Sequence, residues 1–149
     1  MYQYFRTYLL LLCTCLATSL FATGGGEKKR FTLVIDAGHG GHDAGACGKY
    51  GKEKNINLNV ALAFGKLVEA NCPDVKVVYT RKKDVFIPLQ RRADIANSNK
   101  ADLFISIHTN ALPGGKIAYG SETYTLGIAR AAANLEVAKR ENSVITYES

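Results

Sequence analysis

Three short apolar segments, separated by stretches with helical periodicity, constrain the fold of this chain most strongly. They are 31–36 (FTLVID), 75–80 (VKVVYT) and 103–108 (LFISIH). Continuous apolar runs of this length are typical of strands that are buried on both faces of a parallel sheet. Parallel strands need long crossover connections, which are usually helices. The chain is therefore expected to alternate strand, helix, strand, helix and strand, with right-handed crossovers.

Both intervals between these segments carry helical patterns. The first helix is expected over 56–70, where apolar residues recur at the spacing of one helix face: Ile56, Val60, Ala63, Phe64 and Leu67. Pro88 is expected to open the second helix, because its missing N–H costs nothing at that position. The residues that this helix is predicted to turn inward are Leu89, Ala93 and Ala96, with Arg91 outward. The pattern predicts an α/β fold with a parallel sheet.

The chain is less regular after residue 108. Residues 119–126 have alternating character and predict a fourth strand. Residues 128–140 are charged and rich in alanine, which predicts a helix. Val144 and Ile145 are expected to begin a further strand. No internal repeat or low-complexity segment interrupts this order.

The N-terminus has the layout of a secretory signal peptide. Arg6 supplies a short basic region, an apolar stretch follows, and small residues then mark a cleavage site. We expect residues 1–23 to be the signal peptide, 24–30 a linker and 31–149 the folded domain. The mature protein is then exported to the periplasm or cell envelope, and it meets the membrane only during export. A retained membrane anchor is the alternative interpretation.

Composition fits one globular domain, since 47% of the 149 residues are hydrophobic and 21% are charged. The formal net charge is +6, but the basic residues are scattered and no nucleic-acid motif accompanies them. No nucleic-acid partner is therefore expected. Export leaves two of the four cysteines, Cys47 and Cys72, which we interpret as incidental.

Three polar residues stand where the predicted strands end or the first helix begins. His39 follows the first strand, Glu53 precedes the first helix and His108 ends the third strand. Loops at the carboxyl ends of parallel strands form the ligand crevice of an open sheet, so these residues are expected to converge. Two imidazoles and a carboxylate are the ligands of an open, catalytic zinc site, with donor atoms roughly 3–4 Å apart. Asp36 and Asn110 are expected to orient the imidazoles.

Each of these residues also has a simpler interpretation. A histidine at the end of a strand often makes a structural hydrogen bond. A glutamate before a helix complements the helix dipole. An iron site of the facial-triad type uses the same ligand types as the zinc site. The residues alone leave these alternatives open.

Five ordered blocks carry a resemblance to a known family. They are FTLVIDAGHGGHDAG (31–45), EKNINL (53–58), VVYTRKKD (77–84), LQRRADIAN (89–97) and KADLFISIHTNA (100–111). In order and spacing this pattern resembles the zinc-dependent amidases of the N-acetylmuramoyl-L-alanine amidase family, type 3. The resemblance runs from about residue 31 to residue 126.

The resemblance implies a twisted, mostly parallel α/β sheet flanked by helices, with 31–149 as the catalytic domain. It implies one Zn²⁺ ion bound by the residues that match the family ligands: His39, Glu53 and His108. It also implies hydrolysis of the amide between the lactyl group of N-acetylmuramic acid and the L-alanine of the stem peptide, so peptidoglycan is the expected substrate. Recurrent family positions are interpreted as packing and charge-pairing residues: Arg81, Arg91 and Asn97.

One family feature is missing from the sequence. Family members carry a second glutamate, the general base, in a late segment resembling VEVGFLSN, and no such segment occurs here. The base and the C-terminal strands of the sheet are therefore expected beyond Ser149, and the chain alone is expected to be inactive. The glutamates that follow His108 lack this context: Glu122, Glu136, Glu141 and Glu148. The helix expected at 128–140 is either a lid over the site, as in some family members, or an ordinary surface helix.

Two other functions compete with the amidase interpretation. A zinc-containing protein that binds the cell wall without cleaving it would explain the absence of the glutamate. A different zinc hydrolase, such as a peptidase or deacetylase, would use the same ligands on a related sheet. Product analysis on purified muropeptides separates the amidase from the other hydrolases.

Overall fold

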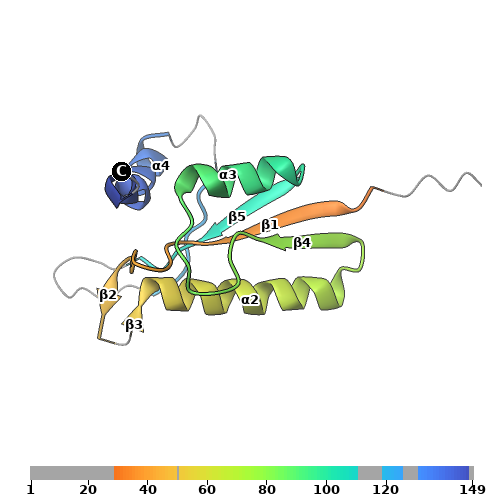
Figure 1. The fold of residues 1–149 in the computed structure, drawn as a ribbon, viewed down its shortest axis with the longest axis horizontal. Coiled ribbons are helices and arrows are strands. Elements are labelled where there is room, and N and C mark those ends of the chain that lie inside the picture. The colour runs from red at the N-terminus through yellow and green to blue at the C-terminus, as the bar shows by residue number, and fades with distance from the viewer. Residues whose placement is uncertain (1–28, 50, 111–118, 126–130, 148–149) are drawn as a thin grey trace, which may run out of the picture.

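The computed structural model of the protein describes residues 29–49, 51–110, 119–125 and 131–147 (Figure 1). In chain order the elements are β1 (Phe31–Ala37), β2 (Cys47–Gly48), β3 (Gly51–Lys52), α2 (Glu53–Asn71), β4 (Val75–Tyr79), α3 (Leu89–Ser98), β5 (Leu103–Ile107), α4 (Ala131–Glu141) and the 3-10 helix η3 (Asn142–Tyr147). The three predicted strands are all present, and each ends within one residue of its predicted position. The predicted burial on both faces holds for β1 alone, since β4 is half-buried and β5 exposes Leu103 and Phe104.

β1 is the central strand of a three-stranded parallel sheet with the order β4-β1-β5. Ile35 of β1 lies opposite Tyr79 of β4 on one side and Ile105 of β5 on the other. α2 covers one face of the sheet and α3 covers the other (Figure 1). The predicted α/β class, with a parallel sheet flanked by helices, is confirmed. The strands end at one common edge, where the small β2-β3 hairpin and α4 also lie (Figure 1).

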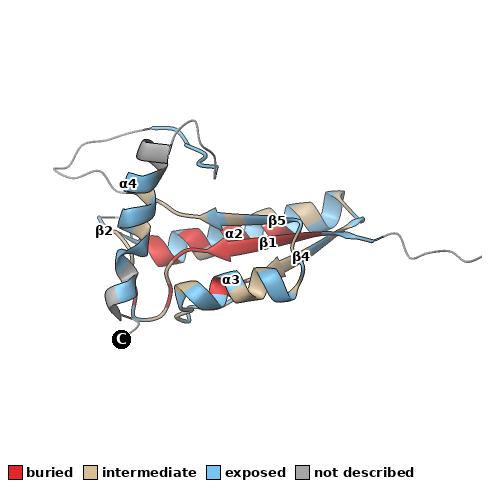
Figure 2. Cartoon of the chain, turned by 90° about the horizontal axis from the view of Figure 1, so that it is seen from above, coloured by how far each residue is buried: buried red, intermediate tan, exposed pale blue. Residues whose placement is uncertain are grey.

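The core is built around β1, which is buried along almost its whole length (Figure 2). Leu33, Ile35 and Ala37 pack with Ala61 of α2. Because side chains alternate along a strand, Val34 and the other even-numbered residues of β1 face the α3 side. Burial on both faces explains why this strand is continuously apolar.

α2 presents a different face to the sheet from the one that its apolar periodicity indicates. Its buried residues are Glu53, Lys54, Asn57, Ala61 and Gly65. Three residues of the predicted apolar face are exposed: Ile56, Val60 and Leu67. The helix approaches the sheet so closely that a Cβ at Gly65 would overlap the hydroxyl of Tyr79. Leu58, Phe64 and Val68 pack against the core from the same helix. The buried face of α2 therefore combines these apolar side chains with the close approach at Gly65 and the inward-pointing Glu53.

α3 has the predicted orientation. Leu89, Ala93 and Ala96 line the cavity on its sheet side, and Arg91 is exposed. Arg92, which the apolar pattern does not place inward, shares this face and is the buried residue of the helix. Its guanidinium bonds to the carboxylate of Asp36 beneath the helix at 2.7 Å. Ala93 is exposed although it lies on the predicted face.

The chain after β5 departs from the predicted pattern in two places. Residues 119–125 form no strand, so the strand predicted at 119–126 is wrong over its described part. Tyr119 is 94% exposed, and a strand without a paired neighbour is not stable in water. Val144 and Ile145 lie in the 3-10 helix η3 and not in a strand. The helix predicted at 128–140 is present as α4, within the part that the structure describes.

No helix among the described residues has the length and apolar character that a membrane span requires. The predicted signal peptide at 1–23 lies outside the described residues and stays a prediction, as does most of the linker at 24–30. Cys47 and Cys72 are both free thiols.

Candidate metal centre

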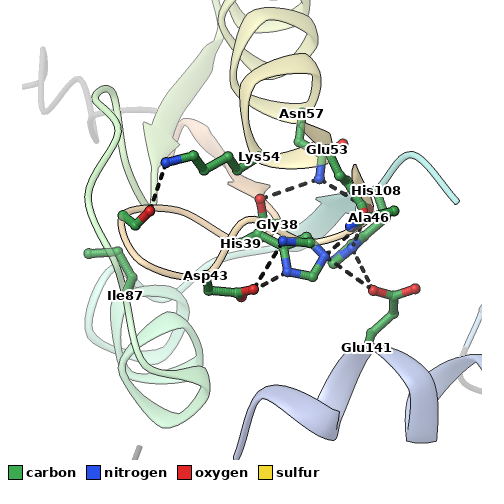
Figure 3. Close-up of polar contacts among 12 residues, drawn as sticks. Gly38, His39, Asp43, Ala46, Glu53, Lys54, Asn57, Ile87, His108 and Glu141 are labelled. Carbon is green, nitrogen blue, oxygen red and sulfur yellow. Dashed lines mark hydrogen bonds and ion pairs between the residues drawn. The ribbon is translucent and has the colours of Figure 1, made fainter. Parts of the chain in front are cut away.

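Four side chains meet at the carboxyl edge of the sheet. His39 comes from the loop after β1, Glu53 is the first residue of α2, His108 follows β5 and Glu141 is the last residue of α4 (Figure 3). Each side chain offers one ligand atom, and these atoms all lie within 4.8 Å of one another. The predicted convergence of His39, Glu53 and His108 is present, with Glu141 as an addition, and the group could hold a metal ion.

The two histidines face this group with different nitrogens. Nε2 of His39 lies 3.3 Å from Oε2 of Glu53 and 3.5 Å from Oε2 of Glu141. Nδ1 of His108 lies 3.2 Å from Oε1 of Glu53 and 2.8 Å from Oε2 of Glu141. Among the buried side-chain nitrogen and oxygen atoms of the described residues, Nε2 of His39 is the one without a hydrogen-bond partner. Buried polar atoms are normally paired, so this nitrogen is available to a ligand inside the group.

Glu53 is held by hydrogen bonds to both of its carboxylate oxygens. Oε2 accepts from the backbone N–H of Ala46 at 2.9 Å, and Oε1 accepts from the backbone N–H of Thr109 at 2.8 Å. The side-chain amide of Asn57, one turn along α2, donates to Oε1 at 3.3 Å. The carboxylate therefore has a fixed direction toward His108 and His39.

The group is strongly coupled electrostatically. Burial alone lowers the pKa of His39, but the carboxylates of Glu141, Glu53 and Asp43 outweigh it and raise that pKa to about 10. Burial also lowers the pKa of His108, but the carboxylates of Glu141 and Glu53 outweigh it and raise that pKa to about 9. Burial favours a higher pKa for Glu141, but the two imidazoles lower it to about 2. The histidines likewise bring the pKa of Glu53 well below its usual range, although burial opposes them.

The loop after β1 bends sharply to bring His39 to the centre. His39 has a φ of 61°, a left-handed conformation that residues other than glycine rarely adopt. Gly40 follows with a φ of 136°. Gly40 and Asp43 then close the turn with two backbone hydrogen bonds, at 2.9 and 3.1 Å. The run of glycines in this motif thus serves a turn that the histidine needs.

Two buried arginines fix the same loop through its carbonyl groups. Arg92 donates to the carbonyl oxygens of Ala37 at 2.9 Å and His39 at 3.0 Å. Arg81 donates to the carbonyl oxygens of Ala37 at 2.8 Å and Gly38 at 2.9 Å. Three consecutive carbonyl groups are therefore tied to guanidinium groups, which leaves the backbone at His39 little freedom.

Asp36 lies beneath the centre and does not orient an imidazole, which differs from our expectation. Its Oδ1 accepts from the hydroxyl of Thr80 at 2.6 Å and from Arg92 at 2.7 Å. Its Oδ2 accepts from the hydroxyl of Ser106 at 2.7 Å. Donors from β5, from α3 and from the residue after β4 thus engage both oxygens, and the carboxylate links the layers of the fold.

Asp43 makes the contact that we expected from Asp36. Its Oδ2 lies 2.8 Å from Nδ1 of His39, and its Oδ1 accepts from the backbone N–H of Gly45 at 3.1 Å. Asn110 is exposed in the segment after β5, and its expected role stays a prediction.

A cavity of about 500 Å³ adjoins the centre on the α3 side. His39, His108 and Glu141 border it, and Phe86 and Phe104 contribute apolar surface to its lining. An organic ligand bound at the metal edge therefore has a mostly apolar hollow beside it, as small-molecule sites usually do.

The sequence patterns do not identify the contributions of Glu141, Asp43 and Arg92. For Asp43 a signal exists, because a carboxylate four residues after a histidine in a glycine-rich turn can reach its ring. For Glu141 no local pattern distinguishes it from the other late glutamates. In the structure Glu122 bonds to Tyr124 and Glu136 pairs with Lys139, while Glu148 lies outside the described residues.

Comparison with known proteins shows the family of the chain. The protein-family model described as N-acetylmuramoyl-L-alanine amidase matches residues 33–148. The N-acetylmuramoyl-L-alanine amidase AmiC of Escherichia coli O6:H1 is 40% identical over 103 residues, which cover 66% of this chain and 24% of that protein. The endolysin of Bacillus phage SPP1 is 48% identical over 90 residues, which cover 60% of this chain and 32% of that protein. The chain thus spans about a quarter to a third of the length of these two relatives.

Solved structures give the same result. The catalytic domain of CwlV, an N-acetylmuramoyl-L-alanine amidase from Bacillus (Paenibacillus) polymyxa var. colistinus, is 43% identical with a TM-score of 0.52, and the match covers 54% of this chain and 45% of that one. An N-acetylmuramoyl-L-alanine amidase from Clostridium difficile 630 is 38% identical with a TM-score of 0.58, and the match covers 62% of this chain and 50% of that one. The chain belongs to the N-acetylmuramoyl-L-alanine amidase family, type 3, whose blocks its sequence resembles.

Proposed function

We propose that this protein takes part in zinc-dependent hydrolysis of the amide between N-acetylmuramic acid and the L-alanine of the peptidoglycan stem. One observation carries the proposal. The chain belongs to this family, and four ligand atoms lie within 4.8 Å of one another at the carboxyl edge of its sheet. They come from His39, Glu53, His108 and Glu141.

The donor set suits zinc. Two imidazole nitrogens and a carboxylate oxygen are zinc ligands in open catalytic sites. Nε2 of His39 has no hydrogen-bond partner among the described residues, as expected for an atom that binds a metal ion. When bound, zinc polarises a carbonyl group and lowers the pKa of a coordinated water to roughly 7. Iron uses the same donor types, so the identity of the ion is part of the test below.

The remaining residues of the site hold the ligands and shape the space beside them. Two backbone N–H groups fix Glu53, so its carboxylate keeps the same direction when water or substrate binds to the metal or leaves it. The cavity on the α3 side offers apolar surface at Phe86 and Phe104, against which the uncharged part of a muropeptide can lie. The site thus combines a polar edge for the amide with an apolar hollow beside it.

We assign the arrangement with Glu141 to a closed state of the site. Four protein donors are typical of structural zinc sites, whereas catalytic sites keep one position for water or substrate. Glu141 is contributed by α4, which lies outside the three layers of the sheet and its helices (Figure 1). Movement of α4 would release one donor and leave the other three in place, which supports the lid interpretation of this helix.

We also propose that the protein is exported and acts in the periplasm or cell envelope. The support is the layout of residues 1–23 together with a substrate that lies outside the cytoplasm. A test is to locate the protein in fractionated cells and to read the N-terminus of the mature form. A protein that retains residues 1–23 and stays in the cytoplasm would contradict export.

The test of the activity is product analysis on purified peptidoglycan. The protein is loaded with zinc, with iron or with a chelator, and the products are examined by mass spectrometry. Residues 1–149 by themselves lack the family's general-base segment and are expected to release nothing. From a form that also carries a segment resembling VEVGFLSN, and with zinc alone, we expect free stem peptides with an L-alanine amino terminus and intact glycan with free lactyl groups. His39→Ala is expected to abolish the reaction, and Lys82→Ala, at an exposed position, serves as the surface control.

Each alternative predicts a different result in the same experiment. A wall-binding protein would sediment with peptidoglycan and release nothing. A peptidase would cut within the stem, and a deacetylase would release acetate and leave the lactyl amide intact. Activity with iron and not with zinc would contradict the proposed metal but would still support the proposed amide hydrolysis.

A further inference from the structure

We propose that Asp43 is a positioning residue that keeps a proton on Nδ1 of His39, so that His39 binds the metal through Nε2. The inference rests on the proposed metal-dependent function. Asp43 is not one of the four donors. Its carboxylate contacts Nδ1 of His39, on the side of the ring that faces away from the donors (Figure 3).

The first support is the geometry of the contact. Oδ2 of Asp43 lies 2.8 Å from Nδ1 of His39, and both side chains are about nine-tenths buried, at 8% and 10% exposure. A carboxylate accepts hydrogen bonds and cannot donate one, so Nδ1 is the protonated nitrogen in this contact. Nε2 is then the nitrogen whose lone pair is available to a metal.

The second support is the state of the opposite nitrogen. Nε2 of His39 is buried and has no hydrogen-bond partner, although carboxylate oxygens of Glu53 and Glu141 lie within 3.5 Å of it. The ring is thus turned so that one nitrogen is fully engaged by Asp43 and the other faces the group of donors. A hydrogen bond behind a metal-binding imidazole normally fixes both its tautomer and its orientation.

The third support is the contrast with His108, which is oriented by packing. Its ring lies so close to Gly38 that a Cβ at that position would overlap the ring. The rings of His39 and His108 meet edge to face, with centroids 4.9 Å apart and planes at 79°. The nitrogen of His108 that faces the donors is Nδ1, so the two histidines are expected to use different nitrogens.

Asp43 is itself well placed to orient a ring. Its backbone exchanges two hydrogen bonds with Gly40, and its second carboxylate oxygen holds the backbone N–H of Gly45 at 3.1 Å. The contact with Gly45 raises another explanation, in which Asp43 shapes the loop and affects His39 only indirectly. A neighbouring carboxylate allows the two to be separated.

Asp84 provides the matched control. Its Oδ1 accepts from the backbone N–H of Gly41 at 2.8 Å, and its Oδ2 bonds to Lys54 at 2.5 Å. It therefore holds the same loop as Asp43, but among the described residues its hydrogen bonds go to Gly41 and Lys54 and not to either imidazole. If loop shape is what matters, Asp84→Asn and Asp43→Asn will have similar effects on metal binding.

The experiment measures zinc affinity by competition with a coloured chelator for the unmodified protein, Asp43→Asn and Asp84→Asn. Asp43→Asn keeps the size of the side chain but has one acceptor oxygen to serve both His39 and Gly45. We expect its zinc affinity to fall roughly 10–100-fold, the usual effect of losing such a partner. Asp84→Asn is expected to stay within about twofold, as for a surface substitution.

A second measurement needs no variant. The protein is labelled with nitrogen-15 at histidine and loaded with an NMR-active cadmium isotope, and the metal–nitrogen couplings are recorded. Coupling to Nε2 of His39 and to Nδ1 of His108, with a slowly exchanging proton on Nδ1 of His39, supports the proposal. Coupling to Nδ1 of His39, or equal losses of zinc affinity in both variants, would overturn it. Failure of the unmodified protein to bind zinc or cadmium would overturn the proposed function itself.

Discussion

Replacing Asp36 with alanine is expected to lower the free energy of unfolding by about 3–5 kcal/mol, because a buried ion pair loses one partner. The side chains of Asp36 and Arg92 are only 4% and 7% exposed, and their charged atoms are 2.7 Å apart. Without Asp36 the guanidinium of Arg92 stays buried without its counter-charge. The hydroxyl of Thr80 also loses its acceptor, but this loss belongs to the same network and is not added.

This loss is large on the scale of a whole domain, which is typically stable by about 5–15 kcal/mol. Asp36→Asn separates charge from shape, because it keeps an oxygen for Arg92 or Thr80 but loses the negative charge. We expect it to cost about 1.5–3 kcal/mol, the value of a hydrogen bond to a charged group. The ranking alanine, asparagine and unmodified protein, from least to most stable, is therefore part of the prediction.

The assay is urea unfolding followed by circular dichroism, with chelator present so that metal does not contribute. Asp94→Ala is the control, because its carboxylate bonds to Gln90 within α3 at 3.0 Å and lies away from the pair. We expect this control to stay within about 0.5 kcal/mol of the unmodified protein. A loss below about 1 kcal/mol for Asp36→Ala would refute the reasoning from burial.

Three further outcomes follow from the structure. Gly65→Ala is expected to destabilise the protein by about 1–3 kcal/mol, since the added Cβ would overlap the hydroxyl of Tyr79. A higher urea midpoint for this variant would show that α2 and β4 leave room for the methyl group. In the metal-free protein the pKa values of His39 and His108 are raised from 6.5 to about 10 and about 9, so their stabilisation is complete below about pH 6.5 and is lost as the pH rises through 9 to 10. Unfolding free energies that stay flat from pH 6 to 10 would contradict this. Glu141→Ala removes one donor from the closed site and is expected to speed zinc transfer to a chelator and to alter the visible spectrum of the cobalt form, and an unchanged spectrum would rule Glu141 out as a ligand.

The positions of the strands were predictable because each is a short apolar run, although burial on both faces explains that run for β1 only. β1 is buried on both faces, so its residues are apolar without alternation, and the ends of such runs mark the ends of the strands. Parallel connections then bring the ends together, which places His39 and His108 at one edge without knowledge of any side-chain contact. The two histidines therefore converge because of the sheet topology, and that topology can be predicted from the sequence.

The rotation of α2 was not predictable from the same kind of pattern. Apolar periodicity predicts that Ile56 and Val60 lie on the buried face of the helix, but both are exposed. The buried face carries Leu58, Phe64 and Val68, together with the close approach at Gly65 and the carboxylate of Glu53, which reaches the histidines. Neither the close approach nor the contact with the histidines is local to the helix. The position of Glu141 was beyond prediction for a related reason, since it depends on how α4 lies against the finished sheet edge.

Three of the four donors differ from the fourth in how firmly the fold holds them. His39 carries a left-handed backbone that costs roughly 1–2 kcal/mol. Hydrogen bonds from charged groups contribute about 1.5–3 kcal/mol each, so the guanidinium contacts of Arg81 and Arg92 are sufficient to offset that cost. His39, like Glu53, is therefore in position before any metal arrives, and binding need not order either residue.

Glu141 has no comparable support. It is the last residue of α4, outside the layers of the sheet, and within the described part of the chain its ion pairs at the site are with His39 and His108. Its carboxylate can therefore leave without disturbing the turn at His39 or the hydrogen bonds of Glu53. The fixed donors are expected to set the affinity for the metal, and the donor on α4 is expected to set whether the fourth position is open.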